Sequence, residues 1–323
     1  MKAKITGVGH FIPNKIIDNK NLSENKNYTI TAEEILLKTG IEERRYVDAG
    51  ITTTDIVCLA VKDLLKNTSK AIEDIDCIIV GTLTPDFFFP STAVSAINKL
   101  KAKNAWGFDL SAACSGFCYG LSVATAMIQQ GTVRNVIICG ADRMSSTINN
   151  FDYKTAVLFG DGAGAVLLEG TNDPKQIIKG NLCKVKADNL EDVYFKTPFN
   201  TESWSDEKFE LEGGKVYRSG VTLMVETIKE YLNEHNLTLS DFDHIIPHQS
   251  NLNMLKDTAR DLQIDISKFK INIQKVGNTG GASIPICLSE FVKKGEIKKG
   301  ERILLVSFGA GYTISIIDLI WAI

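Results

Sequence analysis

The sequence predicts an α/β protein composed of two related halves. Three short apolar runs, at residues 77–80, 136–139 and 303–306, are continuous rather than alternating. Continuous runs are typical of strands that are buried on both faces in a sheet covered by helices. Segments with helical spacing accompany these runs, so the fold class is α/β, with helices packed between and around two related sheets.

The relation between the halves rests on strands that match at one constant offset. Residues 74–80 resemble residues 241–247, and residues 136–140 resemble residues 303–307. The offset is 167 residues in both cases, from position 76 to 243 and from position 136 to 303. One offset shared by two strand pairs indicates an internal duplication of an α/β unit.

The duplication divides the chain near Gly170, into an N-terminal half of residues 1–170 and a C-terminal half of residues 171–323. A helix is expected before the matching strands in each half, at residues 53–66 and 219–235, because apolar side chains recur there at helical spacing. In α/β folds of this kind, ligands bind beyond the carboxyl ends of the strands. Reactive side chains are therefore sought at those ends.

The composition argues against several classes of protein. The chain has 323 residues, of which 44% are hydrophobic, so it can bury a large core. A formal net charge of -3 argues against a nucleic-acid-binding protein. No segment approaches the ~20 apolar residues of a membrane-spanning helix, and the first residues lack the apolar core of a signal peptide. We therefore expect a cytoplasmic protein that does not associate with membranes.

The cysteines indicate neither a disulfide framework nor a metal site. Seven cysteines are present, none of them spaced as in a CxxC pair, and Cys114 and Cys118 have no histidine nearby in the sequence. An odd number of cysteines without a secretion signal argues against structural disulfides. Zinc sites need closely spaced cysteine and histidine ligands. We expect no bound metal and no cofactor.

Cys114 is the first candidate for a reactive group. A short strand ends near Leu110, small residues follow, and a helix is expected at residues 116–130. The unpaired N–H groups and the dipole at a helix N-terminus favour a thiolate, and the small neighbours allow a substrate to approach the sulfur. A free cysteine is more often only a small buried hydrophobic residue, so this segment alone leaves both interpretations open.

His248 and Asn278 occupy two further places where a site is expected. His248 follows the apolar strand that ends at Pro247 and precedes an expected helix at residues 251–262, although histidines at such positions are often structural. Asn278 lies in the glycine-rich segment 276–283, which does not match a phosphate-binding motif. Its glycines indicate tight packing that directs the Asn278 amide into a site, or else an ordinary turn.

Two other segments carry weaker indications. Residues 307–312 follow a strand and could supply backbone N–H donors to an oxyanion. Residues 87–90, three phenylalanines and a proline, are too apolar for a comfortable exposed loop. They belong either to the core or to a surface that a partner covers.

Taken together, these segments resemble the β-ketoacyl-acyl carrier protein synthase III family of the thiolase-like superfamily, nearly end to end. The order and spacing of Cys114, His248 and Asn278 make the resemblance specific. The matching segments are residues 38–45, 113–117, 159–165, 247–252 and 277–279. The resemblance implies a thiolase-like, five-layered αβαβα fold made of two duplicated halves.

The resemblance also implies a reaction. The family consists of acyltransferases of fatty-acid biosynthesis, which condense an acyl-CoA starter with malonyl-acyl carrier protein, with loss of carbon dioxide, to give 3-oxoacyl-acyl carrier protein. Cys114 would carry the acyl group, and His248 and Asn278 would stabilise the enolate of the malonyl thioester. Backbone N–H groups of Cys114 and Ala310 would form an oxyanion hole, and Phe308 would gate the malonyl site. CoA enters as part of a substrate.

Further implications concern assembly and binding. The family forms homodimers, in which Phe89 would reach the acyl pocket of the partner. Lys256 and Arg260 would dock the carrier protein. The sequence departs from the family where a tryptophan and an arginine clamp the CoA adenine, since Glu34 and Tyr153 stand there instead.

These departures keep three hypotheses open. The first is the fatty-acid priming synthase. The second is a related condensing enzyme or acyltransferase of a specialised, secondary-metabolite pathway, which uses another starter or acceptor. The third is a non-catalytic partner subunit, against which the intact set of Cys114, His248 and Asn278 argues. The chain length of the starter and the identity of the carrier protein stay open.

Overall fold

The first sheet is built from the N-terminal part of the chain. The computed structural model describes residues 1–148, 151–175, 177–196 and 209–323. The strand order of this sheet is β1-β7-β6-β4-β5; β4 runs parallel to β5 and β6, whereas β7 is antiparallel to β1 and β6. The strands are β1 (Lys2–Phe11), β4 (Cys77–Gly81), β5 (Trp106–Leu110), β6 (Asn135–Arg143) and β7 (Asp161–Thr171).

The second sheet is built from the C-terminal part. Its strand order is β11-β12-β13-β8, with a parallel pair between β11 and β12 and antiparallel pairs elsewhere. The strands are β8 (Ile178–Val185), β11 (His244–Pro247), β12 (Arg302–Gly309) and β13 (Thr313–Ile320). Two short ribbons lie outside the sheets: β2 (Lys15–Asp18) with β3 (Glu43–Tyr46), and β9 (Val193–Phe195) with β10 (Phe209–Leu211).

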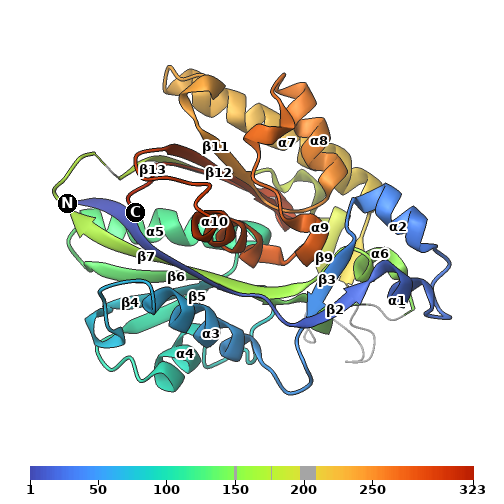
Figure 1. The fold of residues 1–323 in the computed structure, drawn as a ribbon, viewed down its shortest axis with the longest axis horizontal. Helices are drawn as coiled ribbons and strands as arrows, with labels where there is room; N and C mark the ends of the chain where they lie inside the picture. The colour runs from blue at the N-terminus through green and yellow to red at the C-terminus, as the bar shows by residue number, and fades with distance from the viewer. Residues whose placement is uncertain (149–150, 176, 197–208) are drawn as a thin grey trace.

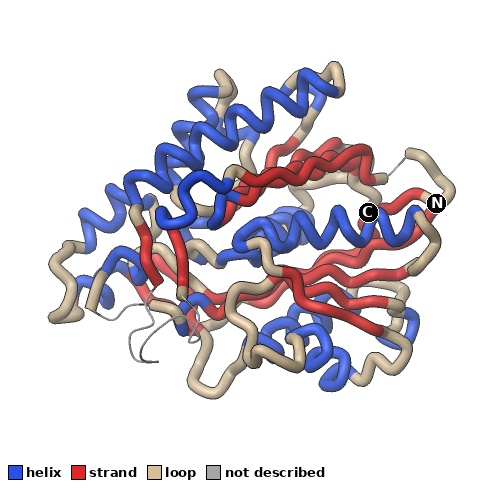
Figure 2. The backbone as a smooth tube through the Cα atoms, turned by 180° about the vertical axis from the view of Figure 1, so that it is seen from behind, coloured by secondary structure: helices blue, strands red, loops and turns tan. Residues whose placement is uncertain are grey.

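Helices cover both sheets and fill the space between them, so the described part of the chain forms five layers (Figure 1; Figure 2 shows them from behind). The central core joins side chains of both sheets to two central helices, and one further core lies between each sheet and its outer helices. This αβαβα arrangement confirms the predicted fold class. The layers contain α3 (Thr53–Leu65) and α4 (Thr92–Leu100) outside the first sheet, α5 (Gly116–Gln129) and α10 (Ser283–Lys293) in the centre, and α7 (Gly213–Glu234) and α8 (Leu252–Asp261) outside the second sheet.

The shorter helices lie around these layers. They are α1 (Asn19–Ser23), α2 (Ala32–Thr39), α6 (Tyr153–Ala156) and α9 (Ile273–Val276). Across the described ranges, no helix combines the length and the apolar character that crossing a bilayer requires.

The expected elements form for identifiable reasons. Strand β4 is buried along its whole length, as its continuous apolar run predicts. Helix α3 begins after a capping box, in which the Thr52 hydroxyl accepts from the Asp55 N–H and the Asp55 carboxylate accepts from the Thr52 N–H. Helix α7 begins at Gly213, earlier than the expected residue 219. The sequence does not predict this first turn, because it contains Gly213 and Gly214 and glycine disfavours helices.

The internal repeat is visible in where equivalent strands begin. Strands β4 and β11 begin at Cys77 and His244, and β6 and β12 begin at Asn135 and Arg302, so both pairs are again 167 residues apart. The repeat is imperfect, because the place equivalent to β5 is occupied by helix α9. Strands of the first sheet end at Thr171 and strands of the second begin with Ile178. The boundary near residue 170 stays a prediction.

Each half also contains an elbow, defined here as residues 111–116 in the first half and 278–283 in the second. Ala113 (φ 49°) and Gly280 (φ 58°) are left-handed residues at equivalent places, and each begins a 3-10 turn that leads into a central helix. A left-handed conformation costs a residue with a side chain about 1–2 kcal/mol, so Ala113 is strained. Such strain concentrates at functional positions, and the residue after Ala113 is Cys114.

Candidate active site

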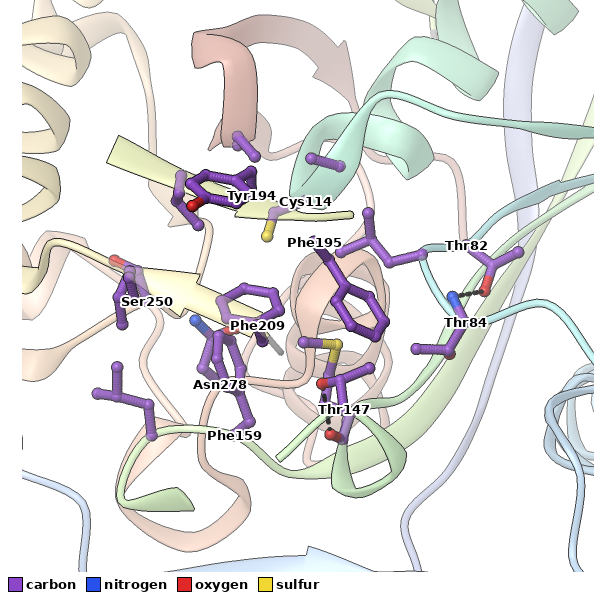
Figure 3. A pocket seen from close by; sticks show the side chains of 18 of the residues that line it. Thr82, Thr84, Cys114, Thr147, Phe159, Tyr194, Phe195, Phe209, Ser250 and Asn278 are labelled. Carbon is purple, nitrogen blue, oxygen red and sulfur yellow. Dashed lines mark hydrogen bonds between the residues drawn. The ribbon is translucent and has the colours of Figure 1, made fainter. Parts of the chain in front are cut away.

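A large cavity lies where the two halves meet. Its volume is about 2050 Å³, and it is lined from the first half by Cys114 and from the second by His248 and Asn278. The side chains of Cys114 and Asn278 are directed into the same space in Figure 3. Residues that are 134 and 164 positions from Cys114 in the chain therefore meet it at one cavity, from position 114 to 248 and to 278.

Cys114 lies in the first elbow, just before helix α5, and is a free, half-buried cysteine. Burial raises the pKa of its thiol to about 12, and the nearby carboxylate of Asp142 raises it further. The expectation that the helix start favours a thiolate is therefore wrong. A helix dipole contributes only about 0.3–1 kcal/mol, which is less than the cost of an anion in this buried place. The resting residue is a thiol and needs a base to become a nucleophile.

His248 lines the same cavity and its imidazole is neutral, a weak base whose lone pair could accept the proton only as the sulfur attacks. It follows strand β11, its backbone N–H donates to the Val306 carbonyl at 2.8 Å, and its side chain is buried. Burial lowers the pKa of the imidazole to about 3. Its Nδ1 atom lies 2.7 Å from the Ser283 hydroxyl, and its ring packs edge-on against Phe308. Because Nδ1 is engaged by Ser283, proton transfer or a substrate contact would use Nε2.

Asn278 is held by one contact of its side chain and two of its backbone. Its Oδ1 atom accepts from the Gly280 N–H at 3.0 Å, which leaves the Nδ2 donors for the cavity. Its backbone N–H donates to the Leu158 carbonyl, and its carbonyl accepts from the Gly160 N–H. The start of the glycine-rich segment at Phe159 therefore holds the backbone of Asn278 in place. The sequence of that segment did not predict this role.

Some of the other predicted site residues line the cavity and some do not. Phe308 and Ala310 line the cavity, and so does Phe89, although 87% of the Phe89 side-chain surface is exposed. Lys256 and Arg260 lie on the exposed face of α8 and do not line the cavity.

The charge of Arg260 is already compensated. Its guanidinium pairs with the carboxylates of Asp257 and Asp261 at 2.6 and 2.9 Å. Arg260 therefore adds little positive charge to a carrier-protein surface, and more of any such charge rests on Lys256.

The two departures from the family have different surroundings. Glu34 belongs to the capping box of α2, where its carboxylate accepts from the Thr31 N–H at 2.9 Å. Tyr153 begins α6 and lines the cavity. Neither arrangement gives an aromatic face stacked with a planar cation.

Sequence reasoning missed an aromatic wall of the cavity. Tyr194, Phe195 and Phe209 come from the ribbon β9–β10, and the ring of Phe209 packs edge-on against Phe159 with centroids 5.1 Å apart. Their sequence context gives no periodic pattern, since the two strands of the ribbon have only three residues each. The wall supplies apolar surface next to Cys114 (Figure 3).

The buried, neutral state of His248 predicts how stability depends on pH. The unfolded imidazole titrates near pH ~6.5, so below that pH the unfolded state binds more protons than the folded state and stability falls. With a folded pKa of about 3, this group should cost about 2 kcal/mol on going from pH 7 to pH 5. His248→Gln cannot take up this proton. Urea unfolding at both pH values measures the free energy of unfolding. From pH 7 to pH 5 the variant should become more stable relative to wild type by about that amount. If the two proteins lose stability in parallel, His248 is not neutral in the folded state.

Comparison with known proteins agrees with the fold and shows the family. Residues 108–184 and 232–321 match family models described as 3-oxoacyl-[acyl-carrier-protein] synthase III and its C-terminal part. The chain is 39% identical to a β-ketoacyl-[acyl-carrier-protein] synthase III of Clostridium perfringens, over 96% of this chain and 97% of that protein.

Solved structures agree as well. A 3-oxoacyl-[acyl-carrier-protein] synthase III of Aquifex aeolicus superposes with a TM-score of 0.92 and 35% identity, covering 99% of this chain and 100% of the other. A priming β-ketosynthase of a polyketide biosynthetic pathway superposes with the same TM-score at 28% identity, covering 99% and 96%. This thiolase-like chain belongs to the 3-oxoacyl-acyl carrier protein synthase III family of condensing enzymes.

Proposed function

We propose that this protein condenses an acyl-CoA starter with malonyl-acyl carrier protein to give 3-oxoacyl-acyl carrier protein, carbon dioxide and CoA. The observation that carries the proposal is the meeting of Cys114, His248 and Asn278 from two halves at one cavity. The family membership supports the same reaction. No metal or cofactor is needed for it, because the leaving carboxylate and the CoA thioester belong to the substrates.

The first half-reaction transfers the acyl group. The Cys114 thiol gives its proton to Nε2 of His248 as the sulfur attacks the starter carbonyl. Backbone N–H groups of Cys114 and Ala310 donate to the oxyanion of the tetrahedral intermediate. The C–S bond to CoA then breaks, the CoA sulfur takes the proton back from His248, and an acyl-Cys114 thioester remains.

The second half-reaction forms the new carbon–carbon bond. Malonyl-acyl carrier protein loses carbon dioxide, and the electron pair of the broken bond passes into an enolate. For this step the imidazole carries its proton on Nε2 while Nδ1 accepts from the Ser283 hydroxyl, a tautomer exchange that solvent allows between the half-reactions. Nε2–H of His248 and Nδ2–H of Asn278 donate to the enolate oxygen, where the negative charge accumulates. The enolate carbon attacks the acyl-Cys114 carbonyl, the C–S bond to Cys114 breaks, and a proton from solvent converts the released thiolate to the thiol. Phe308 beside His248 supplies an apolar wall for the departing carboxylate.

Partners and surroundings follow from the same proposal. The protein acts in the cytoplasm as a homodimer, with Phe89 of one subunit at the acyl pocket of the other. The carrier protein docks on the face of α8 that carries Lys256 and Arg260. The exposed side chains around Phe89 support the dimer: Phe87 and Phe88 are 58% and 60% exposed.

A second function is favoured by one observation. Glu34 is engaged in a helix cap and Tyr153 is not a cation, so the adenine of CoA lacks the stacking pair of the family. A condensing enzyme of a specialised pathway, with another starter or carrier, would have this feature. Acylation by a panel of acyl-CoAs and acyl carrier proteins separates the two candidates: loading from an acyl-CoA supports the first, and loading only from an acyl carrier protein supports the second.

Cys114 should be the acylated residue. Incubation with the preferred acyl-CoA should add one acyl mass to the intact protein, and peptide mapping should place it on Cys114. Cys114→Ala should show no adduct, whereas Cys118→Ala should be acylated normally because Cys118 is completely buried and does not line the cavity. An adduct on Cys118 or Cys139 would refute the assignment.

Asn278→Ala should separate the half-reactions. Removing one donor to a developing oxyanion costs roughly 10²–10³ in rate, so release of carbon dioxide from malonyl-acyl carrier protein should fall by that factor. Radiolabelled acyl transfer to Cys114 should continue, because Asn278 has no part in it. If the variant releases carbon dioxide at the wild-type rate, Asn278 does not hold the enolate.

The dimer should be seen in solution. Light scattering at micromolar concentration should give about twice 35.5 kDa, because three adjacent exposed rings are a liability in a monomer. Phe89→Asp should move the mass toward that of the monomer by placing a charge in the contact. A monomeric wild-type protein would show that the rings have another role.

A further inference from the structure

A buried carboxylate lies behind the site and takes no part in the proposed mechanism. Asp142 is the last but one residue of strand β6 and is completely buried. Its Oδ1 atom accepts from the Leu83 N–H at 2.6 Å and from the Thr82 hydroxyl at 3.1 Å, and its Oδ2 atom accepts from the Gly281 N–H at 2.7 Å. Asp142 therefore joins the loop after β4 to the second elbow.

The internal repeat shows what this contact corresponds to. At the offset of 167 residues, Gly281 is the equivalent of Cys114, and Gly309 at the end of β12 is the equivalent of Asp142. A Cβ atom on Gly309 would lie 2.7 Å from the Cys114 backbone nitrogen. The first elbow thus has a glycine where the second has a carboxylate, and this leaves the Cys114 N–H for a substrate oxygen.

In the second elbow, the place that corresponds to the oxyanion hole is occupied by a side chain of the protein itself. The Gly281 N–H is the pseudo-symmetric counterpart of the Cys114 oxyanion donor, and the Asp142 carboxylate accepts from it. The preceding residue has to be glycine here, because a Cβ atom on Gly280 would lie 2.3 Å from Oδ2 of Asp142. The Gly280 N–H in turn donates to Oδ1 of Asn278. Two successive N–H groups of one turn therefore link the carboxylate to the Asn278 amide.

We propose that Asp142 is a positioning residue for the condensation step: its carboxylate fills the inactive oxyanion hole of the second half and so fixes the direction of the Asn278 amide. This role rests on the proposed function, in which Asn278 holds the enolate oxygen. It predicts that loss of Asp142 harms the decarboxylation and condensation half-reaction but not acyl transfer to Cys114.

Asp142→Asn is the sharpest test, because the side chain keeps its shape while one acceptor becomes a donor. If Oδ1 stays on the Leu83 N–H, the new amide N–H₂ faces the Gly281 N–H, and two donors oppose each other in a buried place. The turn that carries Asn278 should move. A misplaced group of this kind costs up to ~10²-fold, so the rate of carbon dioxide release should fall roughly 10- to 100-fold, in kcat more than in KM for the malonyl substrate.

Acylation of Cys114 in Asp142→Asn should be unchanged or faster. The carboxylate is one of the causes that raise the pKa of the thiol, and the variant removes that charge. The matched control is Asp318→Asn, which alters another buried carboxylate, bonded to Arg302 and Tyr231 in the second sheet. The control should lose stability while the ratio of the two half-reaction rates stays at the wild-type value.

Each outcome bears on one proposal. Asp142→Asn with a wild-type ratio of the half-reactions, or with both slowed equally, overturns the role of Asp142. A wild-type protein that takes up no acyl group, or releases no carbon dioxide, overturns the proposed function instead. A crystal structure of the variant gives a readout independent of activity: an Asn278 side chain in its original place overturns the positioning role. If Asp142→Asn does not fold, Asp142→Ser replaces it, since its smaller side chain leaves room for a water at Gly281.

Discussion

The whole site depends on the close packing of each elbow against the other half of the molecule. A Cβ atom on Gly140 of β6 would lie 2.1 Å from the Gly281 carbonyl oxygen, and Gly309 of β12 lies against the Cys114 backbone. The end of a central strand from one half therefore supports the elbow of the other. Because the contacts cross in this way, Cys114 of the first half and His248 and Asn278 of the second half meet without a separate active-site domain.

Burial determines the protonation states at this junction. It raises the pKa of the Cys114 thiol and lowers that of the His248 imidazole, so the pair rests as two neutral groups rather than as an ion pair. The same exclusion of water strengthens fixed hydrogen-bond donors near developing charge, which is why the two oxyanion sites rely on backbone N–H groups, an amide and a neutral imidazole.

The sequence was sufficient for features that lie in short, continuous segments. The buried strands, the offset between the halves and the neighbourhoods of Cys114, His248 and Asn278 could all be predicted from local pattern. Asp142 could not, because its donors lie 59 and 139 positions away at Leu83 and Gly281. The direction in which the pKa of the Cys114 thiol shifts could not be predicted from the sequence either. Desolvation depends on the assembled layers and not on the helix start alone.

Duplication explains why the chain has one site and not two. The offset equates Ser111 with Asn278, Cys114 with Gly281, Gly81 with His248 and Asp142 with Gly309, so each residue of the proposed site has a counterpart of different chemistry. A thiol at position 281 would start from a Cβ atom 3.4 Å from the Asp142 carboxylate, which would disfavour its anionic form. The anion that closes the second elbow thus removes a competing nucleophile site. The same contact with Asp142 fixes the second elbow, and the second elbow in turn holds the Asn278 amide in the cavity beside Cys114.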